Sequence, residues 1–469
     1  MSEESEFDFK EWEQASLKKT FHYSFGYLLV FFMGSQFNSY VFYYYEVEIG
    51  LPVALLGLAF VIFAVWNMIN DPLVGYLTDR PFKWSMKYGF RAPWMVIGVI
   101  PYLICWWLLF AAPEALIKLS DPWPIFWYFV IMSCLFDTFY SIFSTHINAG
   151  FTTHFRTDAE RRRSSAINTT IPQILALFMG FTVPLIYVYG NRDSMVLAQS
   201  IVVLLLVFCV LLLIPGIKET EDIKERFQRG YETTERQSYS KTIKAAFKRK
   251  NFVSTLIVFA LLTLGDILYK ASSVYFMKDV LSLPLYNAVF TGLAWFAGFI
   301  LFIPFWSNLS KRYGHGKIMK LSCILIAIVY LPQLFIVNLF QAIFFSFCGG
   351  FVAGAFWVTL GPVQADVYDE STVETGKHQE AMYEGIRTLF YRMTIIGQAI
   401  IFVLIHTMTA YNPNPNAVQT DLAVLGIRIH AGLIPSLCAF IAFIVMYKWY
   451  DLTGAKQSML KPRLKELKL

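Results

Sequence analysis

The chain has 469 residues, of which 56% are hydrophobic, 17% aromatic and 15% charged, whereas soluble domains carry about 25% charged residues. This composition excludes an ordinary soluble domain, and the length allows about a dozen membrane-spanning helices of ~20 residues. The formal net charge of +6 lies in the polar breaks between apolar stretches, so we expect no nucleic-acid partner.

Twelve apolar segments separated by polar breaks predict an all-α membrane protein. Residues 1–13 are acidic and polar and lack the basic start of a signal peptide, so we expect the first segment to remain as a helix. The six cysteines lie inside apolar segments without metal-ligand spacing. The segments cover approximately residues 21–46, 53–78, 93–112, 124–152, 165–189, 194–216, 251–278, 285–308, 317–333, 336–364, 380–408 and 422–449.

The first segment carries amide, hydroxyl and aromatic side chains on an otherwise apolar stretch, among them Gln36 and Tyr44. Such groups are typical of a sugar-binding surface, but also of helix packing and of an aromatic belt at the membrane interface. We predict Gln36 and Tyr44 to be substrate-binding residues, with packing as the alternative.

The second segment contains a carboxylate, Asp71, in a stretch built otherwise mainly from apolar residues. A carboxylate facing lipid there costs roughly 2.5–3.5 kcal/mol, so an acidic residue inside the membrane indicates a functional site. Asn67 lies four residues before Asp71 and therefore shares its helix face. We predict that Asp71 binds a coupling cation with help from Asn67 and Asn70, the alternative being hydrogen bonds that hold helices together.

Charged residues follow the second and fourth segments, at Asp79-Arg80 and at Thr157 to Arg163. Cations at such helix ends can hold the two halves of a transporter together. We predict Asp79, Arg80 and Arg162 to be gate residues. Within the fourth segment, Asp137 is a candidate for the proton path or for substrate hydroxyls, and His146 is expected to pack as a hydrogen-bond donor.

The longest polar break, Lys218 to Lys250, divides the segments six and six and predicts a cytoplasmic linker near the anionic leaflet. Asp266 and Lys270, four residues apart in the seventh segment, are predicted to form an ion pair. A structural role is favoured for this pair over substrate contact.

The tenth and eleventh segments carry a close-packing pattern and a set of charges. Gly350 and Gly354 have the spacing that lets two helices approach closely. Glu384 and Arg387 are predicted to form an inner gate or a fixed salt bridge. Arg392 is expected to neutralise Asp71 when no cation is bound, with a permanent ion pair as the alternative.

The distribution of basic residues predicts the orientation in the membrane. One set of alternate loops holds about 32 of the 39 lysines and arginines, and the other holds Lys118, Arg192 and Lys278. By the positive-inside rule, both termini face the cytoplasm. Two sets of six helices joined by a central loop indicate the major facilitator architecture, with domains at 1–216 and 251–469 and a linker at 217–250.

Five short runs in the sequence, taken together, match the motifs of a known family: Phe42-Tyr43-Tyr44-Tyr45, Asn70-Asp71-Pro72-Leu73-Val74-Gly75, Arg91-Ala92-Pro93-Trp94, Phe356-Trp357-Val358 and Ala365-Asp366-Val367-Tyr368-Asp369. Together they resemble the glycoside–pentoside–hexuronide:cation symporter family, to which the bacterial melibiose permease belongs. The last two runs are similar to the family's tenth helix and the loop after it. The similarity covers nearly the whole chain.

The resemblance implies a cation site at Asp71 and Asn70, joined by Thr388 of the eleventh helix. Asn67 stands where the family has a further aspartate in the second helix, and Thr145 where it has one in the fourth. Both replacements remove negative charge, whereas sodium prefers several oxygen ligands and anionic charge. We therefore expect a proton as the coupling ion and no cofactor; Na⁺ bound at Asp71 is the alternative.

The resemblance also implies solute-binding residues, which this chain retains in part. Trp357 matches the tryptophan of the tenth helix, and Arg392 stands where the permease has lysine in the eleventh. Three other positions read Phe31, Ala149 and Thr170 instead of the family's aspartate, tryptophan and arginine. We therefore predict the substrate-binding residues to be Trp357, Arg392, Asp137, Gln36, Tyr44 and Thr145.

No enzyme signature is present: the sequence contains no GxSxG, P-loop, HExxH or CxxC pattern. We predict a cation-coupled symporter of a sugar, glycoside or similar small polar solute, working by alternating access. Alternatives are a carrier of lysolipids or other amphiphiles, and a membrane sensor that does not transport. The expected partners are the solute, the cation and the lipid bilayer of the cell membrane, and the protein is expected to be a monomer.

Overall fold

The computed structural model describes residues 15–78, 82, 85–155, 158–221, 223–224, 246–375, 380–452 and 454–466. These residues form helices and connecting loops with no β-strand among them. Eleven helices in this part of the chain are long and apolar enough to cross a membrane. The prediction of an all-α membrane protein is confirmed.

The first half of the chain contributes six long helices, with short helices between some of them. The predicted segment 21–46 is a helix that continues from α1 through two π-helical segments, Phe37–Val41 and Tyr44–Glu48. The helices are α1 (Leu17–Gln36), α2 (Val53–Thr78), α3 (Ser85–Tyr88), α4 (Ala92–Phe110), α5 (Glu114–Ile117), α6 (Trp123–His154), α7 (Asp158–Gly180), α8 (Thr182–Ile186) and α9 (Arg192–Ile217).

The second half repeats this pattern after the linker. The predicted linker at 217–250 lies largely outside the described residues, and α12 begins at its end. The helices are α12 (Lys250–Tyr275), α13 (Ala288–Tyr313), α14 (His315–Tyr330), α15 (Leu339–Thr375), α16 (Glu380–Met408), α17 (Asp421–Arg428), α18 (Ile434–Trp449) and α19 (Ala455–Glu466). Two π-helical segments occur in this half: Phe276–Val280 extends α12, and Ile429–Leu433 joins α17 to α18. A 3-10 turn precedes α13 at Leu285–Asn287, and another follows α14 at Leu331–Phe335.

The largest error in a predicted boundary concerns the tenth segment. The segment expected at 336–364 continues to Thr375, so the residues compared above with a loop after the tenth helix are helical. Polar partners stabilise this extension: Arg249 Nε lies 3.0 Å from Glu374 Oε2, and Gln457 Nε2 donates to Asp366 Oδ2 at 2.6 Å. These contacts come from residues far away in the sequence, so local hydropathy does not show them.

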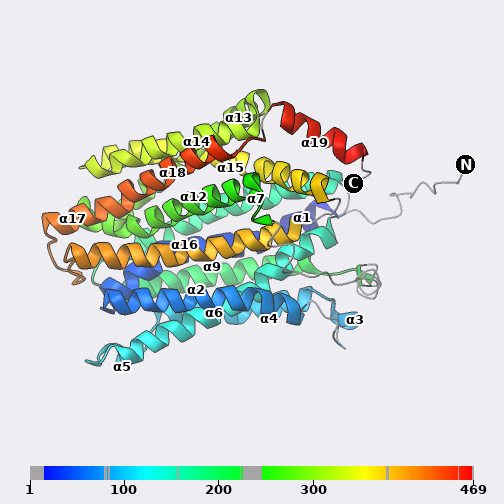
Figure 1. Cartoon of the computed structure of the whole chain (residues 1–469). Helices are drawn as coiled ribbons and strands as arrows, with labels where there is room; N and C mark the ends of the chain where they lie inside the picture. Colours follow the sequence, from blue (N-terminus) through cyan, green and yellow to red (C-terminus); the bar gives the residue numbers. More distant parts are fainter. Residues whose placement is uncertain are drawn as a thin grey trace, which may run out of the picture.

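The helices form one layered bundle in which each half packs mainly on itself (Figure 1). In the first half α1 packs on α7 and α9, and α4 on α6; in the second half α15 packs on α13 and α14, and α12 on α18. The halves meet where α2 contacts α16 and where Phe37–Val41 contacts α12. A solute site between the halves would therefore be bordered by α1, α2, α12 and α16.

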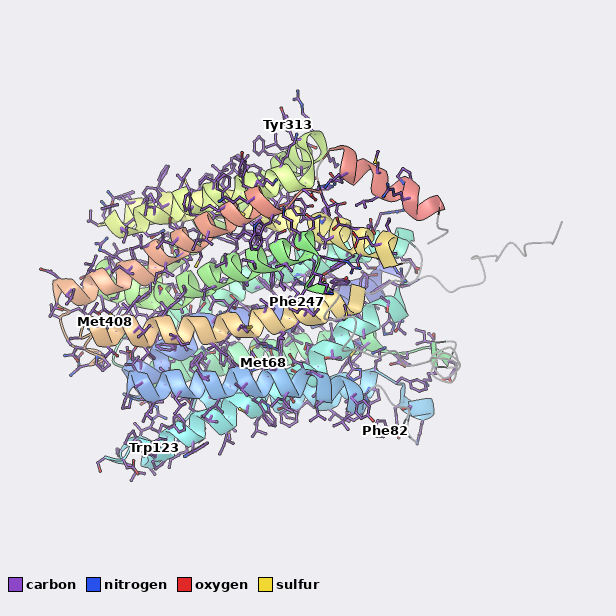
Figure 2. The ribbon with its side chains drawn as sticks, viewed as in Figure 1. Met68, Phe82, Trp123, Phe247, Tyr313 and Met408 are labelled. Carbon is purple, nitrogen blue, oxygen red and sulfur yellow. The ribbon has the colours of Figure 1, made fainter. Side chains whose placement is uncertain are left out.

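The bundle has two distinct ends. The start of α1 and helix α19 lie at one end, which we call the termini end, and α5 and α17 lie at the other, the distal end (Figure 1). Trp123 and Met408 mark the distal end, and Phe82 lies at the termini end (Figure 2). Large apolar side chains are exposed along the outer faces of the helices, for example Leu204, Leu211, Leu301 and Phe340, as expected for contact with lipid.

Glycines allow a close contact between α13 and α15 in the second half. A Cβ added to Gly350 would lie 1.9 Å from the Trp295 carbonyl oxygen, and one added to Gly298 would lie 2.1 Å from that of Phe347. Only a residue without a side chain fits at such a distance. The packing role predicted for Gly350 agrees with this geometry.

Candidate functional site

An ion pair joins the two halves in the middle of the bundle. Arg392 of α16 places Nη2 2.9 Å and Nε 3.3 Å from the same carboxylate oxygen of Asp71, Oδ2, on α2. Asp137 of α6 also faces this guanidinium, with Oδ1 3.7 Å from Arg392 Nη2. We call Asp71, Asp137 and Arg392, with the neighbours Asn70 and Ser141, the carboxylate cluster.

Ser141 and Asn70 complete the cluster. The Ser141 hydroxyl donates to Asp71 Oδ1 at 2.5 Å, and the Asn70 amide donates to Asp137 Oδ2 at 3.2 Å. All four carboxylate oxygens therefore have a partner within the protein. Asp137 and Ser141 lie one turn apart on α6 and therefore share a face of that helix. The helix thus supplies one carboxylate of the cluster and the hydroxyl that binds the other carboxylate.

The charges of the cluster do not balance. Two carboxylates face one guanidinium, and Asp137 and Arg392 are buried, with 2% and 11% of their side chains exposed. A buried charge without a partner is costly. One proton or one monovalent cation would neutralise the cluster.

Proline at position 72 frees one further oxygen near the cluster. It follows Asp71 inside α2 and has no N–H to donate to the Met68 carbonyl one turn earlier.

In the described residues no group of three or more histidine, cysteine, aspartate or glutamate side chains could hold a metal ion. A sodium ion here would need hydroxyl, amide or carbonyl oxygens in addition to the two carboxylates.

The cluster borders a cavity of about 370 Å³ between the halves. Thr388 and Thr145 line this cavity together with Asp71, Asp137 and Arg392, and the Thr388 hydroxyl donates to the Glu384 carbonyl of its own helix at 3.0 Å. Asn67 is fully buried and donates to the Phe63 carbonyl at 2.8 Å, away from this cavity. Of the predicted cation ligands, Asn70 reaches the cluster and Asn67 does not.

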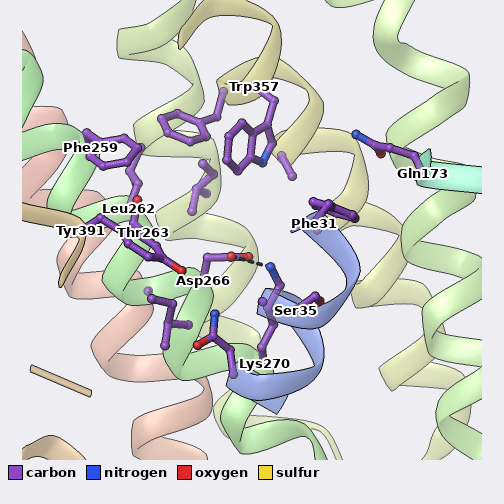
Figure 3. Close-up of a pocket in the computed structure, with 18 of the residues that line it drawn as sticks. Phe31, Ser35, Gln173, Phe259, Leu262, Thr263, Asp266, Lys270, Trp357 and Tyr391 are labelled. Atoms are coloured by element: carbon purple, nitrogen blue, oxygen red, sulfur yellow. Dashed lines mark hydrogen bonds and ion pairs between the residues drawn. The ribbon is translucent and has the colours of Figure 1, made fainter. Parts of the chain in front are cut away.

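A larger cavity, of about 610 Å³, lies beside the first and shares Gly34, Asn38, Tyr140 and Tyr391 with it. Trp357, which is predicted to bind solute, lines this cavity and is about half exposed. We call the space the solute cavity after that prediction. The close-up in Figure 3 shows side chains of α1, α7, α12, α15 and α16 around the same space, with the Asp266–Lys270 ion pair among them. The predicted ion pair is present, with 2.7 Å between Lys270 Nζ and Asp266 Oδ2.

Gln36, Tyr44 and His146 line neither cavity. Tyr44 is buried near the distal end, where its hydroxyl donates to the Phe110 carbonyl. Gln36 is buried within α1, and His146 stacks on Trp94 at 6.1 Å between ring centroids. These three residues therefore make packing contacts. The predicted solute-binding role of Gln36 and Tyr44 has no support from their positions and stays a prediction.

The predicted gate residues are scattered. Asp79 and Arg80 lie outside the described residues, and Arg162 is exposed near the start of α7. Glu384 and Arg387 do pair, with Arg387 Nε 2.8 Å from Glu384 Oε2, but on the same helix. Tyr368 of α15 also donates to Glu384 at 2.7 Å. Their contacts therefore lie within one half and do not bridge the two.

A buried network at the distal end does bridge the halves. Glu46 of the first half accepts a hydrogen bond from Tyr275 at 2.5 Å and lies 2.8 Å from His406 Nδ1. His406 lies 3.3 Å from His430, which in turn lies 2.6 Å from the Ser272 hydroxyl. We call these five residues the distal seal.

Sequence reasoning missed the distal seal. Glu46 could have indicated it, because this residue is an acid at the end of an apolar segment. His406 and His430 also lie near the ends of apolar segments. A further contact across the halves closes the same end, because the Tyr189 hydroxyl of the first half donates to the Leu283 carbonyl of the second at 3.2 Å.

The fold is that of a major facilitator transporter. The nucleoside transporter NupG superposes with a TM-score of 0.57 at 17% identity, covering 92% of this chain and 100% of that one. A D-xylose-proton symporter gives 0.63 at 11% identity, covering 92% and 98%. At such identities these structures establish the fold alone.

Residues 22–454 match the family described as MFS/sugar transport protein. The chain belongs to this melibiose-permease-like family, as the sequence resemblance implied, and a transporter family is not an enzyme class. Among curated relatives, the sodium-dependent lysophosphatidylcholine symporter 1-A of Danio rerio is 22% identical over 427 residues, 81% of this chain and 76% of the relative. The symporter YnaJ of Bacillus subtilis is 21% identical over 441 residues, 89% and 88% of the two chains.

Proposed function

We propose that this protein is a symporter that couples an inward cation gradient to the uptake of a sugar, glycoside or similar polar solute. The observation that supports this most strongly is the carboxylate cluster. It contains an unbalanced negative charge, joins α2 to α16 across the two halves, and borders a cavity that shares its lining with the solute cavity.

The cluster suggests how coupling works. Without a cation, Arg392 holds Asp71 from the other half of the molecule. A cation that binds Asp71 competes with this guanidinium and neutralises the cluster, which weakens the bond between α2 and α16. Relative movement of the halves then costs less when the cation is bound, and this difference is what links an ion to a conformational change.

The orientation proposed from the loop charges places the termini end in the cytoplasm. The distal seal then closes the extracellular side, so the structure corresponds to an inward-facing state.

We propose a proton as the coupling ion. Each carboxylate oxygen already has a partner, so a proton needs no new ligands, whereas sodium would require several oxygens to rearrange around it. Sodium is the alternative. Asp137 favours it, because this second carboxylate supplies the anionic charge that Asn67 and Thr145 do not. Relatives described as sodium-dependent point the same way.

The solute cavity combines groups suited to a sugar. Trp357 offers an aromatic face, and Ser35, Asn38 and Gln173 offer hydroxyl and amide groups. A lysolipid or similar amphiphile is the second candidate, favoured by relatives described as lysophosphatidylcholine symporters and by apolar side chains such as Phe31 in the same cavity.

Uptake into proteoliposomes tests both parts of the proposal. A panel of radiolabelled sugars and lysophosphatidylcholines is offered with an inward proton gradient, an inward sodium gradient, or neither. We expect accumulation of a sugar that survives replacement of sodium by choline and disappears when the pH gradient is collapsed. Accumulation that needs sodium would overturn the proton, and uptake of lysophosphatidylcholine alone would overturn the sugar.

A further inference from the structure

The Asp266–Lys270 ion pair stands apart from the other charges inside the membrane. About a third of each side chain is exposed, 34% for Asp266 and 32% for Lys270, and both line the solute cavity. A pair that only stabilised the fold would need no such access. Charged residues that face a cavity within the membrane commonly mark the path of a solute.

The pair has unused hydrogen-bonding capacity. Lys270 donates to Asp266 Oδ2, and within the described part of the chain neither side chain has another hydrogen-bond or salt-bridge partner. Asp266 Oδ1 can therefore accept a hydrogen bond, and Lys270 can donate two more. An acceptor and donors thus lie side by side on one face of α12, in a pair with no net charge.

The surroundings of the pair suit a flat, hydroxyl-bearing solute. Figure 3 shows Trp357 from α15 and Ser35 from α1 around the space that Asp266 and Lys270 face. The indole presents an apolar face that can cover one side of a sugar ring, while polar groups bind its edge.

We propose that Asp266 and Lys270 bind two neighbouring hydroxyl groups of a neutral polyhydroxy solute, one hydroxyl donating to Asp266 and the next accepting from Lys270. This inference rests on the proposed sugar substrate. A neutral solute can bind without separating the two charges, whereas a charged solute would have to break the pair. The site lies in the second half of the chain and is separate from the carboxylate cluster.

Two tyrosines connect the solute site to that cluster. Tyr140 and Tyr391 line both cavities, and Tyr391 directly precedes Arg392 in α16. A solute held at Asp266 and Lys270 therefore lies next to side chains that also border the cation site. Occupancy of the two sites can influence each other through this shared wall.

Equilibrium binding to the full-length protein in lipid nanodiscs tests the inference. The probes are D-glucose, D-galactose, D-xylose, melibiose and lysophosphatidylcholine, followed by singly deoxygenated analogues of the sugar that binds most tightly. The test variant, Asp266→Leu with Lys270→Met, removes both charges together, because a single substitution would leave one charge unpaired and could prevent folding. The control variant is Glu114→Leu with Lys118→Met, which removes an exposed ion pair of the same spacing at the start of α5 and the residue after its end.

We expect the test variant to keep its thermal stability and to bind the best sugar about tenfold to a hundredfold more weakly, as is typical when hydrogen bonds to charged groups are lost. It should no longer distinguish that sugar from the analogue lacking the bound hydroxyl. The control should behave as wild type.

Wild-type affinity and discrimination in a folded test variant would overturn this inference and leave the proposed sugar transport intact. A wild-type protein that binds lysophosphatidylcholine and none of the sugars would overturn both. The two failures are therefore distinguishable.

Discussion

Arg392 bonds to one carboxylate of the other half and faces a second. Its charge is shared because Asp71 and Asp137 approach it from different helices of the first half. Removing the guanidinium would leave two carboxylates with no compensating charge, although Asp71 is about a quarter exposed and so partly screened.

Replacing Arg392 by glutamine should make stability depend on cations. We expect Arg392→Gln to be less stable than wild type by about 2–3 kcal/mol, a discounted value for breaking a buried pair. Lower pH or added sodium should restore stability, because either supplies the missing positive charge. Thermal unfolding in detergent at several pH values and sodium concentrations measures this, with Arg392→Lys as the control. A loss that neither protons nor sodium relieves would contradict the charge balance described above.

Part of the site could be predicted from the sequence. Asp71 stood out because an acid in an apolar segment is costly, and the resemblance pointed to Arg392. The contacts of Asp137 and Ser141 could not be predicted, since they depend on how α6 is rotated against α2. Asn67 shares a helix face with Asp71, yet it bonds its own backbone instead. Periodicity identifies a helix face but not what that face contacts.

At the scale of the elements, the α13–α15 contact shows how little space separates two backbones. Gly350 lies against the Trp295 backbone, while Gly361 on the same helix has open space around it. The two positions therefore form a matched pair for testing this contact.

Replacing Gly350 by alanine should push α13 and α15 apart. We expect Gly350→Ala to destabilise the protein by about 1–3 kcal/mol, the usual cost of overpacking. Gly361→Ala should be neutral or slightly stabilising, because alanine favours the helix. Thermal unfolding of both variants in the same detergent is the measurement, and equal midpoints would show that the helices do not meet as closely as described.

Element boundaries followed from hydropathy where a helix ends at a loop, as for α2, which spans Val53–Thr78 as predicted. They failed for α15, whose last turns are polar and are stabilised by Arg249 and Gln457. Such partners are distant in the sequence, and local composition therefore does not show them.

At the scale of the whole molecule, the distal seal joins the halves at one end, in addition to the Asp71–Arg392 ion pair. Glu46 is the residue of the first half in the distal seal, and Tyr275 and His406 of the second half bond to it. Nothing in the sequence indicated which end would be closed, because closure is a property of one conformation and not of a helix pattern.

Replacing Glu46 by glutamine should loosen this closure. Charge-assisted hydrogen bonds are roughly twice as strong as neutral ones, so the neutral amide of Glu46→Gln should favour opening of the distal end. Hydrogen–deuterium exchange of peptides covering residues 40–50 and 400–411 should rise several-fold. The control is Glu114→Gln, an exposed substitution at the same end. Unchanged exchange in Glu46→Gln would show that the seal does not hold the halves together.

Asp71 is the residue through which, in the proposed function, a cation gradient drives transport. The direct measurement compares accumulation and equilibrium exchange of the transported solute by wild type and Asp71→Asn in proteoliposomes with an inward cation gradient. We predict that wild type concentrates the solute inside, while Asp71→Asn only equilibrates it and still exchanges solute across the membrane. Undiminished uphill accumulation by Asp71→Asn would contradict the account.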